Sequence, residues 1–426
     1  MSIDFKNTII KKHIMEGNFG LEKESLRITP EGNLSHTKHP FTGNPNMERD
    51  FCENQTELIT DVFHSVDAVW DEIAKLHYDA VDQLLKLDTG KEYLWPFSNP
   101  PYVKGENDIP IAKYSGELKQ KEIYREYLAS KYGKKKMLFS GIHFNFSFPD
   151  VILEEGWKNS EFETLKEYKN YIYLDLAKKV TSYTWLIVYL TAASPLMDGS
   201  FFQDDDIGRS VARDYGSARC SEIGYWNEFV PLLDYTNLDT YISSIEKYIE
   251  EGSLKEISEL YYPVRLKPKG ANSLEALKEK GVNHIELRMI DLNPLSPVGI
   301  KKEDLYFLHL FIVYLLSLKD SNFEYYEQLM AIRNEKNAAK YESRGMWIEV
   351  GWNQSIPIRD IAFDILFDME LFFCKLGLED AIECIRYQLQ KVIHTEKRYV
   401  VQIKKQFGEQ YVEKGLELIK NYAEGS

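Results

Sequence analysis

The segment from Phe19 to Ile28, FGLEKESLRI, constrains this chain most, because it places Glu22 and Glu24 two residues apart in a run that predicts a strand. Alternate residues of a strand share a face, so both carboxylates point the same way. Two carboxylates this close repel each other and lose solvation, a cost that folds accept mainly where a cation lies beside them. The segment therefore favours a divalent-metal site, and the alternative is an exposed edge strand with a solvated acidic face.

Length and charge restrict the classes of protein to which the chain can belong. Its 426 residues allow either one elaborated domain or two tightly joined domains with a large buried core. The formal net charge of -15 argues against non-specific nucleic-acid binding and supplies no polybasic anchor for a membrane surface. An anionic substrate would therefore need local positive charge, from metal ions or from a few arginines.

The cysteines and the N-terminus point to a reducing cytoplasm. No CxxC pair occurs, so neither a zinc cluster nor a disulfide framework is indicated by the four widely spaced cysteines, Cys52, Cys220, Cys374 and Cys384. Residues 1–17 lack the apolar core and the cleavage site of a signal peptide. Two apolar runs, 183–193 and 305–318, are too short to span a membrane, so we expect buried helices there.

Three further segments, 50–60, 137–148 and 284–293, also predict strands. In each of them, alternate positions carry polar side chains of the kinds that bind metals or phosphates, beside an apolar row. The polar rows are Glu53, Gln55 and Glu57 in the first segment, His143, Asn145 and Ser147 in the second, and Glu286 and Arg288 in the third.

Helical periodicity dominates much of the remaining sequence. Ser65 is a predicted N-cap for a long amphipathic helix, and residues 119–132 predict another. From about 303 to 426 the pattern is helical throughout, and we expect this part to pack on the sheet. His309 lies on an apolar helical face and Cys52 points away from the neighbouring glutamates, so both are interpreted as core residues.

Together the four polar rows suggest strands that converge on a shared funnel of carboxylates, although each row alone would also suit a solvated outer face. Oxygen ligands with at most one imidazole favour Mg2+ or Mn2+ over Zn2+. Arg288 beside Glu286 suits phosphoryl transfer, in which charge builds on the transferring oxygens, although an ion pair with its neighbours is the simpler interpretation. No GxxxxGK(S/T) or GxGxxG motif follows a strand, so metal ions and arginines would hold any ATP phosphates.

A series of motifs covering about residues 15 to 300 resembles bacterial glutamate-cysteine ligase, both its stand-alone type and the N-terminal module of bifunctional glutathione synthetases. The motifs, in order, are FGLEKESLRIT with GNLSHTKHP, DFCENQTELIT, LWPFSNPPY, IYREYLASKYG, SGIHFNFSFP, ASP at 193–195, ELYYPVR and IELRMIDLNP. The series is far more specific than any one motif, whereas the helical remainder matches only in general character.

The resemblance implies a glutamine-synthetase-like α+β fold, in which a curved antiparallel sheet forms a funnel for ATP, metal ions and glutamate. It implies one catalytic domain over residues 1–426, with the funnel at about 15–300 and a helical packing region at about 301–426. It also implies the reaction: ATP phosphorylates the glutamate side-chain carboxylate, and the cysteine amine displaces phosphate to give γ-glutamylcysteine, the first step of glutathione synthesis.

The resemblance also assigns roles to the charged residues. It implies one Mg2+ held by Glu24, Asp50 and Glu57, a second held by Glu22, His143 and Glu286, and a third shared by Glu22 and Glu286. Arg288 would stabilise the transferring phosphoryl group, with Glu57 and Glu286 completing the catalytic set. Asn145 would lie near ATP, together with Glu22 and Arg288. Asp50 alone disagrees with the polar rows, because a regular strand would turn it away from Glu57, and we expect a bulge or bend there.

The acceptor pocket of the family maps onto six residues, Phe51, Tyr124, Leu128, Arg219, Tyr225 and Tyr261. Arg219 is the natural partner of the amino-acid carboxylate, because its guanidinium fork matches that group. The stand-alone type has a glutamine near the position of Met137, so cysteine as the acceptor is less firmly implied than the ligase chemistry. No ATP-grasp module follows the helices, so the second step of glutathione synthesis is not expected from this chain.

Rival interpretations stay open at the level of sequence. The chain could be another ATP-dependent carboxylate-amine ligase of the same fold that joins glutamate to a different amine. It could also be a non-catalytic ligand-binding relative. However, a protein that had lost catalysis would be expected to lose some of the charged site residues, and all of them are present. A guanidino kinase would need a phosphagen site, for which no motif occurs. The expected partners are ATP, L-glutamate and L-cysteine, and nothing in the sequence demands more than a monomer.

Overall fold

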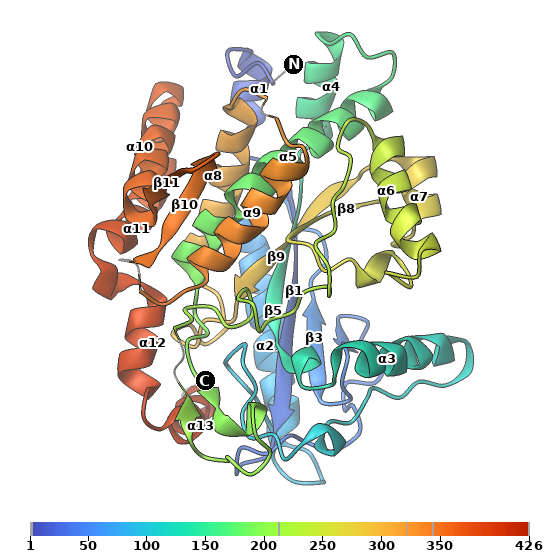
Figure 1. Cartoon of the computed structure of the whole chain (residues 1–426), viewed down its shortest axis with the longest axis vertical. Helices are drawn as coiled ribbons and strands as arrows, with labels where there is room; N and C mark the ends of the chain where they lie inside the picture. The colour runs from blue at the N-terminus through green and yellow to red at the C-terminus, as the bar shows by residue number, and fades with distance from the viewer. Residues whose placement is uncertain (1–2, 212–213, 321, 343–344, 425–426) are drawn as a thin grey trace.

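A computed structural model describes residues 3–211, 214–320, 322–342 and 345–424, and at its centre lies a seven-stranded antiparallel sheet (Figure 1). The strand order is β2-β3-β1-β5-β9-β8, with β4 pairing to β1. The strands are β1 (Asn18–Ile28), β2 (Met47–Arg49), β3 (Gln55–Ile59), β4 (Tyr93–Leu94), β5 (Gly141–Ser147), β8 (Val264–Lys267) and β9 (His284–Asp291). The α+β class with an antiparallel sheet, expected from the sequence, is confirmed.

The two faces of this sheet differ because its strands alternate. On β1, Phe19 and Leu21 are buried in the main apolar core, together with Phe144 and Phe146 of β5. The residues between them, such as Glu22, point to the opposite face. Alternation therefore sends the apolar row into the core and leaves the polar row free for a site.

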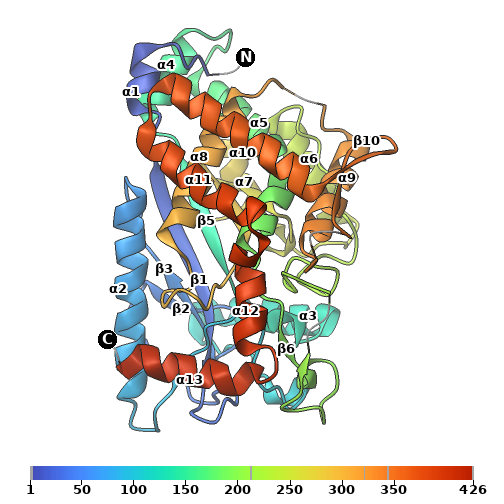
Figure 2. The same ribbon diagram turned by 90° about the vertical axis from the view of Figure 1, so that its left-hand side faces the viewer.

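Helices cover the apolar face of the sheet (Figure 2). They include α2 (Val66–Leu85), α5 (Leu165–Thr191) and α8 (Lys302–Ser317). Ser65 caps α2, since its hydroxyl oxygen accepts a hydrogen bond from the Ala68 N–H at 3.2 Å. The two apolar runs belong to the buried helices α5 and α8, as expected. No helix in the described part of the chain is both long and apolar enough to cross a membrane.

His309 of α8 is the core residue that the sequence predicted. It is 2% exposed, and its ring packs against Phe19 and Phe146 with centroids 5.0 and 5.3 Å apart. Burial lowers the pKa of His309 to about 4, so the imidazole is neutral at physiological pH. Cys52 is likewise fully buried in an apolar cluster.

Shorter elements surround the sheet and its covering helices. They are α1 (Thr8–His13), α3 (Lys119–Tyr132), α4 (Asp150–Lys158), α6 (Leu238–Glu250), α7 (Leu274–Lys280) and the two-stranded pair β6 (Met197–Asp198) and β7 (Ser210–Val211). α3 occupies the predicted range, and one of its faces borders the cavity described below.

The C-terminal part is mostly helical, but the expectation of helices throughout is wrong in one place. The helices are α9 (Tyr325–Ala338), α10 (Ile358–Leu376), α11 (Glu379–Ile393), α12 (Tyr399–Phe407) and α13 (Tyr411–Glu424). Between α9 and α10, β10 (Trp347–Gly351) and β11 (Gln354–Pro357) form a hairpin. Asn353 in its two-residue loop has a φ of 55°, a left-handed conformation that asparagine tolerates and a tight hairpin requires.

Residues 50–60 are not one extended strand. β2 ends at Arg49, a turn follows, and β3 begins at Gln55, whose carbonyl accepts the Asp50 N–H at 3.0 Å. The bend expected at Asp50 is therefore a hairpin turn, which places Asp50 across from Gln55 and on the same face as Glu57.

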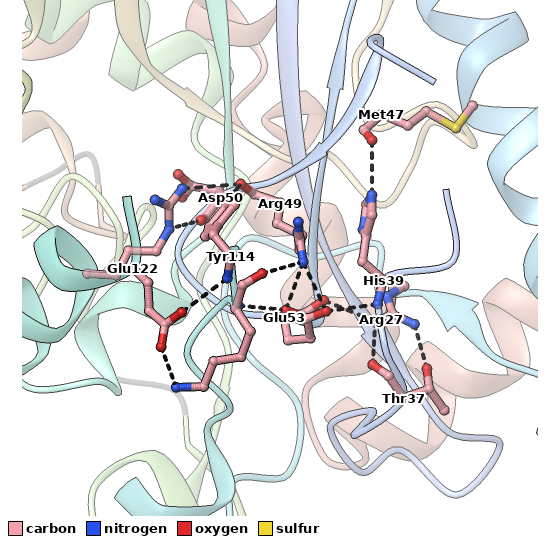
Figure 3. Close-up of polar contacts among 11 residues, drawn as sticks. Arg27, Thr37, His39, Met47, Arg49, Asp50, Glu53, Tyr114 and Glu122 are labelled. Atoms are coloured by element: carbon pink, nitrogen blue, oxygen red, sulfur yellow. Dashed lines mark hydrogen bonds and ion pairs between the residues drawn. The ribbon is translucent and has the colours of Figure 1, made fainter. Parts of the chain in front are cut away.

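Because of this turn, Glu53 does not belong to the polar row, contrary to expectation. Its carboxylate accepts hydrogen bonds from the backbone N–H groups of His39 and Lys113 at 3.0 and 2.9 Å, and it pairs with Arg49 at 3.3 Å (Figure 3). Glu53 thus fixes the hairpin turn to the neighbouring loops and contributes nothing to the cavity.

Candidate active site

A cavity of about 430 Å3 opens on the polar face of the sheet. Apart from Asn145, every residue predicted for a metal, ATP or the acceptor lines it: Glu22, Glu24, Asp50, Phe51, Glu57, Tyr124, Leu128, His143, Arg219, Tyr225, Tyr261, Glu286 and Arg288. Met137 lines it as well. Segments more than 200 residues apart in the chain thus converge on one space; the roles of these residues remain predictions.

Strand register explains why the polar rows meet. Glu24 of β1 lies opposite Glu57 of β3, and Glu22 lies opposite His143 of β5. Directly opposed residues of an antiparallel pair point to the same face. The His143 Nδ1 is 3.0 Å from a Glu22 carboxylate oxygen, and the His143 Nε2 is 3.6 Å from Glu24.

A bulge in β9 places Arg288 in the same group. Ile142 of β5 pairs with Ile290 of β9, and Phe144 pairs with Leu287. One residue separates the two positions on β5, whereas two residues separate them on β9. The Arg288 Nη1 lies 3.2 Å from a Glu286 oxygen and 3.4 Å from the His143 Nδ1. Bulges redirect side chains in this way beside many functional sites.

Three carboxylates, Glu24, Asp50 and Glu57, form what we call the acidic wall of the cavity. Burial raises the pKa of Glu24 to about 8, with a further contribution from Asp50 and against the opposing effects of Arg219 and Arg288. Burial, followed by Asp50, also raises the pKa of Glu57 well above its ordinary value. The acidic wall thus carries more carboxylates than the nearby cations balance.

The opposite wall carries an excess of cations, which we call the basic wall and define as Arg265, Lys267 and Arg288. All three surround Glu286, with nitrogen-oxygen distances of 3.8, 3.5 and 3.2 Å. Burial alone would raise the pKa of Glu286, but Arg288, Lys267 and Arg265 together hold it well below its ordinary value. Glu22 and Glu24 also interact with Arg288, but Glu286 is the carboxylate that all three cations share, and their N–H groups can bind an anionic ligand.

Arg265 and Lys267 were not predicted from the sequence. They alternate along β8, and Arg265 lies opposite Glu286 in the register. The run Val264–Lys267 alternates, but the family motif ELYYPVR ends at Arg265 and does not include Lys267. Extending it by two residues would have placed both cations on the face of Glu286.

The residues at the boundary of the two walls fit a divalent metal. Glu22, Glu57 and His143 each offer one ligand atom, and these atoms lie within 4.8 Å of one another. The His143 Nε2 is buried without a hydrogen-bond partner, and burial lowers the pKa of this imidazole, favouring the neutral form that ligates metals. Carboxylates with one imidazole suit Mg2+ or Mn2+.

Asn145 takes a supporting position. It lies opposite Glu286 in the strand register but does not line the cavity. Its side-chain amide donates to a Glu22 oxygen at 3.1 Å. This contact orients Glu22, whereas a direct contact of Asn145 with ATP stays a prediction.

The third part of the cavity is an apolar pocket beside Arg219. Phe51, Leu128, Met137 and Tyr261 belong to one buried cluster, and the rings of Tyr225 and Tyr261 are 4.1 Å apart. This pocket suits a small side chain, and the Arg219 guanidinium at its edge suits a carboxylate.

Gly141 is a third residue that sequence reasoning missed. A Cβ at this position would lie 2.4 Å from the Arg219 Cζ, so only glycine lets the guanidinium rest against β5. The Gly141 N–H also donates to a Glu24 oxygen at 2.8 Å. The only signal in the sequence was a glycine inside the predicted strand 137–148, which often marks a close approach.

Comparisons with known proteins agree with this architecture. The family description "Glutamate-cysteine ligase" matches residues 4–339. The glutathione biosynthesis bifunctional protein GshAB of Listeria monocytogenes is 38% identical over 431 residues, which cover 97% of this chain and 55% of that protein. The protein of the same name from Clostridium perfringens is 36% identical, over 78% of this chain and 44% of its own length. The chain thus spans about half the length of the curated relatives it matches.

Two solved structures share the fold. A bifunctional glutathione synthetase from Pasteurella multocida superimposes with a TM-score of 0.85 and 25% identity, covering all of this chain and 54% of that one. A glutamate-cysteine ligase from Francisella tularensis in complex with AMP also gives a TM-score of 0.85, at 22% identity, covering 96% of this chain and 89% of that one. The fold expected from the resemblance is therefore confirmed.

Proposed function

The chain belongs to the glutamate-cysteine ligase family, and from this premise we propose that it joins the γ-carboxylate of L-glutamate to the amine of L-cysteine, converting ATP to ADP and phosphate. The observation that carries the proposal is the division of one cavity into an acidic wall, a basic wall and an apolar pocket beside Arg219. These are the three environments that cations, phosphates and an amino-acid acceptor require.

We assign Mg2+ to the acidic residues. Glu24, Asp50 and Glu57 would hold one ion, and Glu22, His143 and Glu286 a second. The bound ions would neutralise charge on the phosphates of ATP. The raised pKa values of Glu24 and Glu57 support this assignment, because they reflect carboxylates crowded without sufficient cations. Mn2+ is an alternative with the same ligand preference.

The basic wall supports the first chemical step. A glutamate carboxylate oxygen attacks the γ-phosphorus of ATP, the bond to the bridging oxygen breaks, and γ-glutamyl phosphate and ADP form. Negative charge spreads over the transferring oxygens, where Arg288 is placed to meet it. Lys267 and Arg265 add positive charge on the same side, since both lie within 4 Å of Glu286.

Arg219 and the apolar pocket support the second step. The acceptor carboxylate binds the Arg219 guanidinium, which leaves the amine to attack the acyl carbon of γ-glutamyl phosphate. An amide bond forms, phosphate leaves, and the amine loses a proton. The acceptor side chain then lies among Phe51, Leu128 and Met137, and all three side chains are nearly fully buried.

A different acceptor is the second candidate, and Met137 favours it. The residue is 3% exposed and belongs to an apolar cluster, so the pocket offers no amide to a thiol at this point.

The product γ-glutamylcysteine would serve glutathione synthesis, the process named for the bifunctional relatives. We also propose that the protein acts as a monomer in the cytoplasm, where cysteine stays reduced and ATP is present.

The test is Mg2+-dependent ADP release by the purified protein with ATP and L-glutamate, with and without L-cysteine, and identification of the product by mass. A cysteine-stimulated rate with γ-glutamylcysteine supports the proposal. Stimulation only by another amine keeps the ligase chemistry and changes the acceptor. If no ADP forms with any amine of a panel, the chain is a non-catalytic relative.

A further inference from the structure

On the face of β1 opposite the cavity, a buried cation lies between the two acidic residues of the strand. Lys23 follows Glu22 and precedes Glu24, so alternation sends its side chain into the core side of the sheet. The side chain is 3% exposed. Its Nζ lies 2.9 Å from the Nδ1 of His77 on α2, and His77 is itself 8% exposed.

Lys23 lacks the counter-charge that a buried cation normally has. Among the described residues, no carboxylate lies within ion-pair distance of its Nζ, and its hydrogen-bonding partner is an imidazole. An ammonium group has three N–H donors and His77 accepts one of them, so two donors have no hydrogen-bond partner in the described part of the chain. A buried charge with unused donors is costly unless another group satisfies it.

A small cavity of about 30 Å3 adjoins this ammonium group. It lies between α2, β4, the loop before α8 and the C-terminal helix α13, and its walls are mainly apolar, including Trp95, Pro96, Leu292 and Ile419. Gly299 closes one side with a φ of +90°, and a Cβ there would be 3.1 Å from the Lys23 Cε. The volume accommodates one water molecule or one ion of similar size.

We propose that this cavity binds a small monoanion of the size of chloride, held by the two remaining N–H donors of Lys23 and by the apolar walls. A water molecule would satisfy the donors but not the charge. A sulfate or phosphate ion would exceed the space and would need more donors than the site provides. A weakly hydrated monoanion meets all three conditions, namely volume, charge and number of donors.

The direct experiment uses bromide as the probe. The full chain is crystallised with gluconate as the counter-anion, soaked in sodium bromide, and measured at the bromine absorption edge. An anomalous peak within hydrogen-bond distance of the Lys23 Nζ supports the proposal. Absence of that peak, while bromide appears elsewhere on the surface, overturns it. This measurement requires no variant and no catalytic activity.

A solution experiment compares Lys23→Met with a matched exposed control, Lys91→Met. Chloride and bromide are titrated at constant ionic strength against gluconate, and thermal unfolding is followed. The wild type and the control should show the same saturable rise in Tm of a few degrees, whereas Lys23→Met should show none. Sulfate should produce no saturable rise in any of them. An unchanged halide response in folded Lys23→Met would refute the site, and if that variant does not fold, the bromide measurement on the wild-type protein decides.

Discussion

The two faces of β1 carry opposite charges, with carboxylates on the cavity face and a lysine on the core face, so one strand contributes to two kinds of site. Toward the cavity, Glu24 belongs to the acidic wall with Asp50 and Glu57, where burial and the neighbouring carboxylates raise the pKa of Glu24 and of Glu57. Toward the core, Lys23 has an imidazole partner, and no carboxylate of the described residues lies within ion-pair distance of it. Alternation separates these groups onto opposite sides of the sheet, so they cannot neutralise one another.

The same physical cause acts with opposite sign on the two faces. Burial raises the pKa of Glu24 to about 8 and lowers the pKa of Lys23 to about 7, because in each case it disfavours the charged form. On a single strand, an unbalanced buried charge therefore marks each place where a ligand of the opposite charge would be stabilised. On the cavity face of β1 that ligand would be a cation, and on the core face it would be an anion.

The largest expected effect tests the cavity face. Glu57→Gln should reduce ADP release by about 10^3-fold or more, because it removes a carboxylate from the proposed Mg2+ ligands and leaves the fold intact. Turnover and circular dichroism check this result. The matched control is Glu48→Gln on the adjoining strand, directly across from Glu57 but outside the cavity, which should keep most activity. Unchanged turnover in Glu57→Gln would remove this residue from the metal set.

Arg288 tests the basic wall, with the next largest effect. Arg288→Met should lower kcat by about 10^2- to 10^3-fold, since a cation beside the transferring phosphoryl group is lost where charge develops. Arg288→Lys should recover part of that loss. Steady-state kinetics with ATP as the varied substrate separate kcat from KM. A change confined to KM would instead make Arg288 a ground-state binding residue.

The pH dependence of stability tests the crowded carboxylates, with a smaller expected effect. The folded protein holds the Glu24 proton up to a pKa of about 8, against 4.5 for an unperturbed glutamate. At Glu24 the folded state therefore binds more protons than the unfolded chain in this window, so the contribution of Glu24 to the free energy of unfolding should fall as pH rises from about 4.5 to about 8. Denaturant titrations without divalent metal ions measure this fall.

Two comparisons sharpen that prediction. Magnesium acetate should reduce the loss of stability, because bound Mg2+ favours the ionised carboxylates that crowding disfavours. Glu24→Gln should show a smaller dependence on pH than the wild type. An identical pH profile for the wild type and Glu24→Gln would mean that Glu24 is not protonated in the metal-free protein.

Met137 gives the smallest expected effect. Met137→Gln adds one amide to the acceptor pocket and should raise the preference for L-cysteine over its apolar isostere L-2-aminobutyrate by roughly 2- to 10-fold, the contribution of a single hydrogen bond. The ratio of kcat/KM values for the two acceptors measures the preference, and each variant serves as its own control. No change in the ratio would show that the acceptor side chain does not reach this wall.

Several parts of the site could be predicted from the sequence because they depend on strand alternation alone. Glu22 with Glu24 and His143 with Asn145 each share a face for this reason. Arg288 lies beside Glu286 as alternation predicts, but the bulge in β9 also contributes to its position. Local periodicity gave the wrong result for Glu53, because the hairpin turn between β2 and β3 interrupts the run of residues 50–60. It also missed the hairpin of β10 and β11 inside a largely helical region.

By itself the sequence determined the polar rows and the family resemblance, because these depend on the order and spacing of residues, and the resemblance in turn implied the α+β class. Only the tertiary structure decided which charges face one another. It brought Arg265 and Lys267 to Glu286, placed Asp50 on the face of Glu57, and paired Lys23 with the His77 imidazole and with no carboxylate among the described residues. The physical reason is that a buried charge is stabilised or destabilised by neighbours from distant strands, and strand register, which sets those neighbours, is a property of the folded sheet.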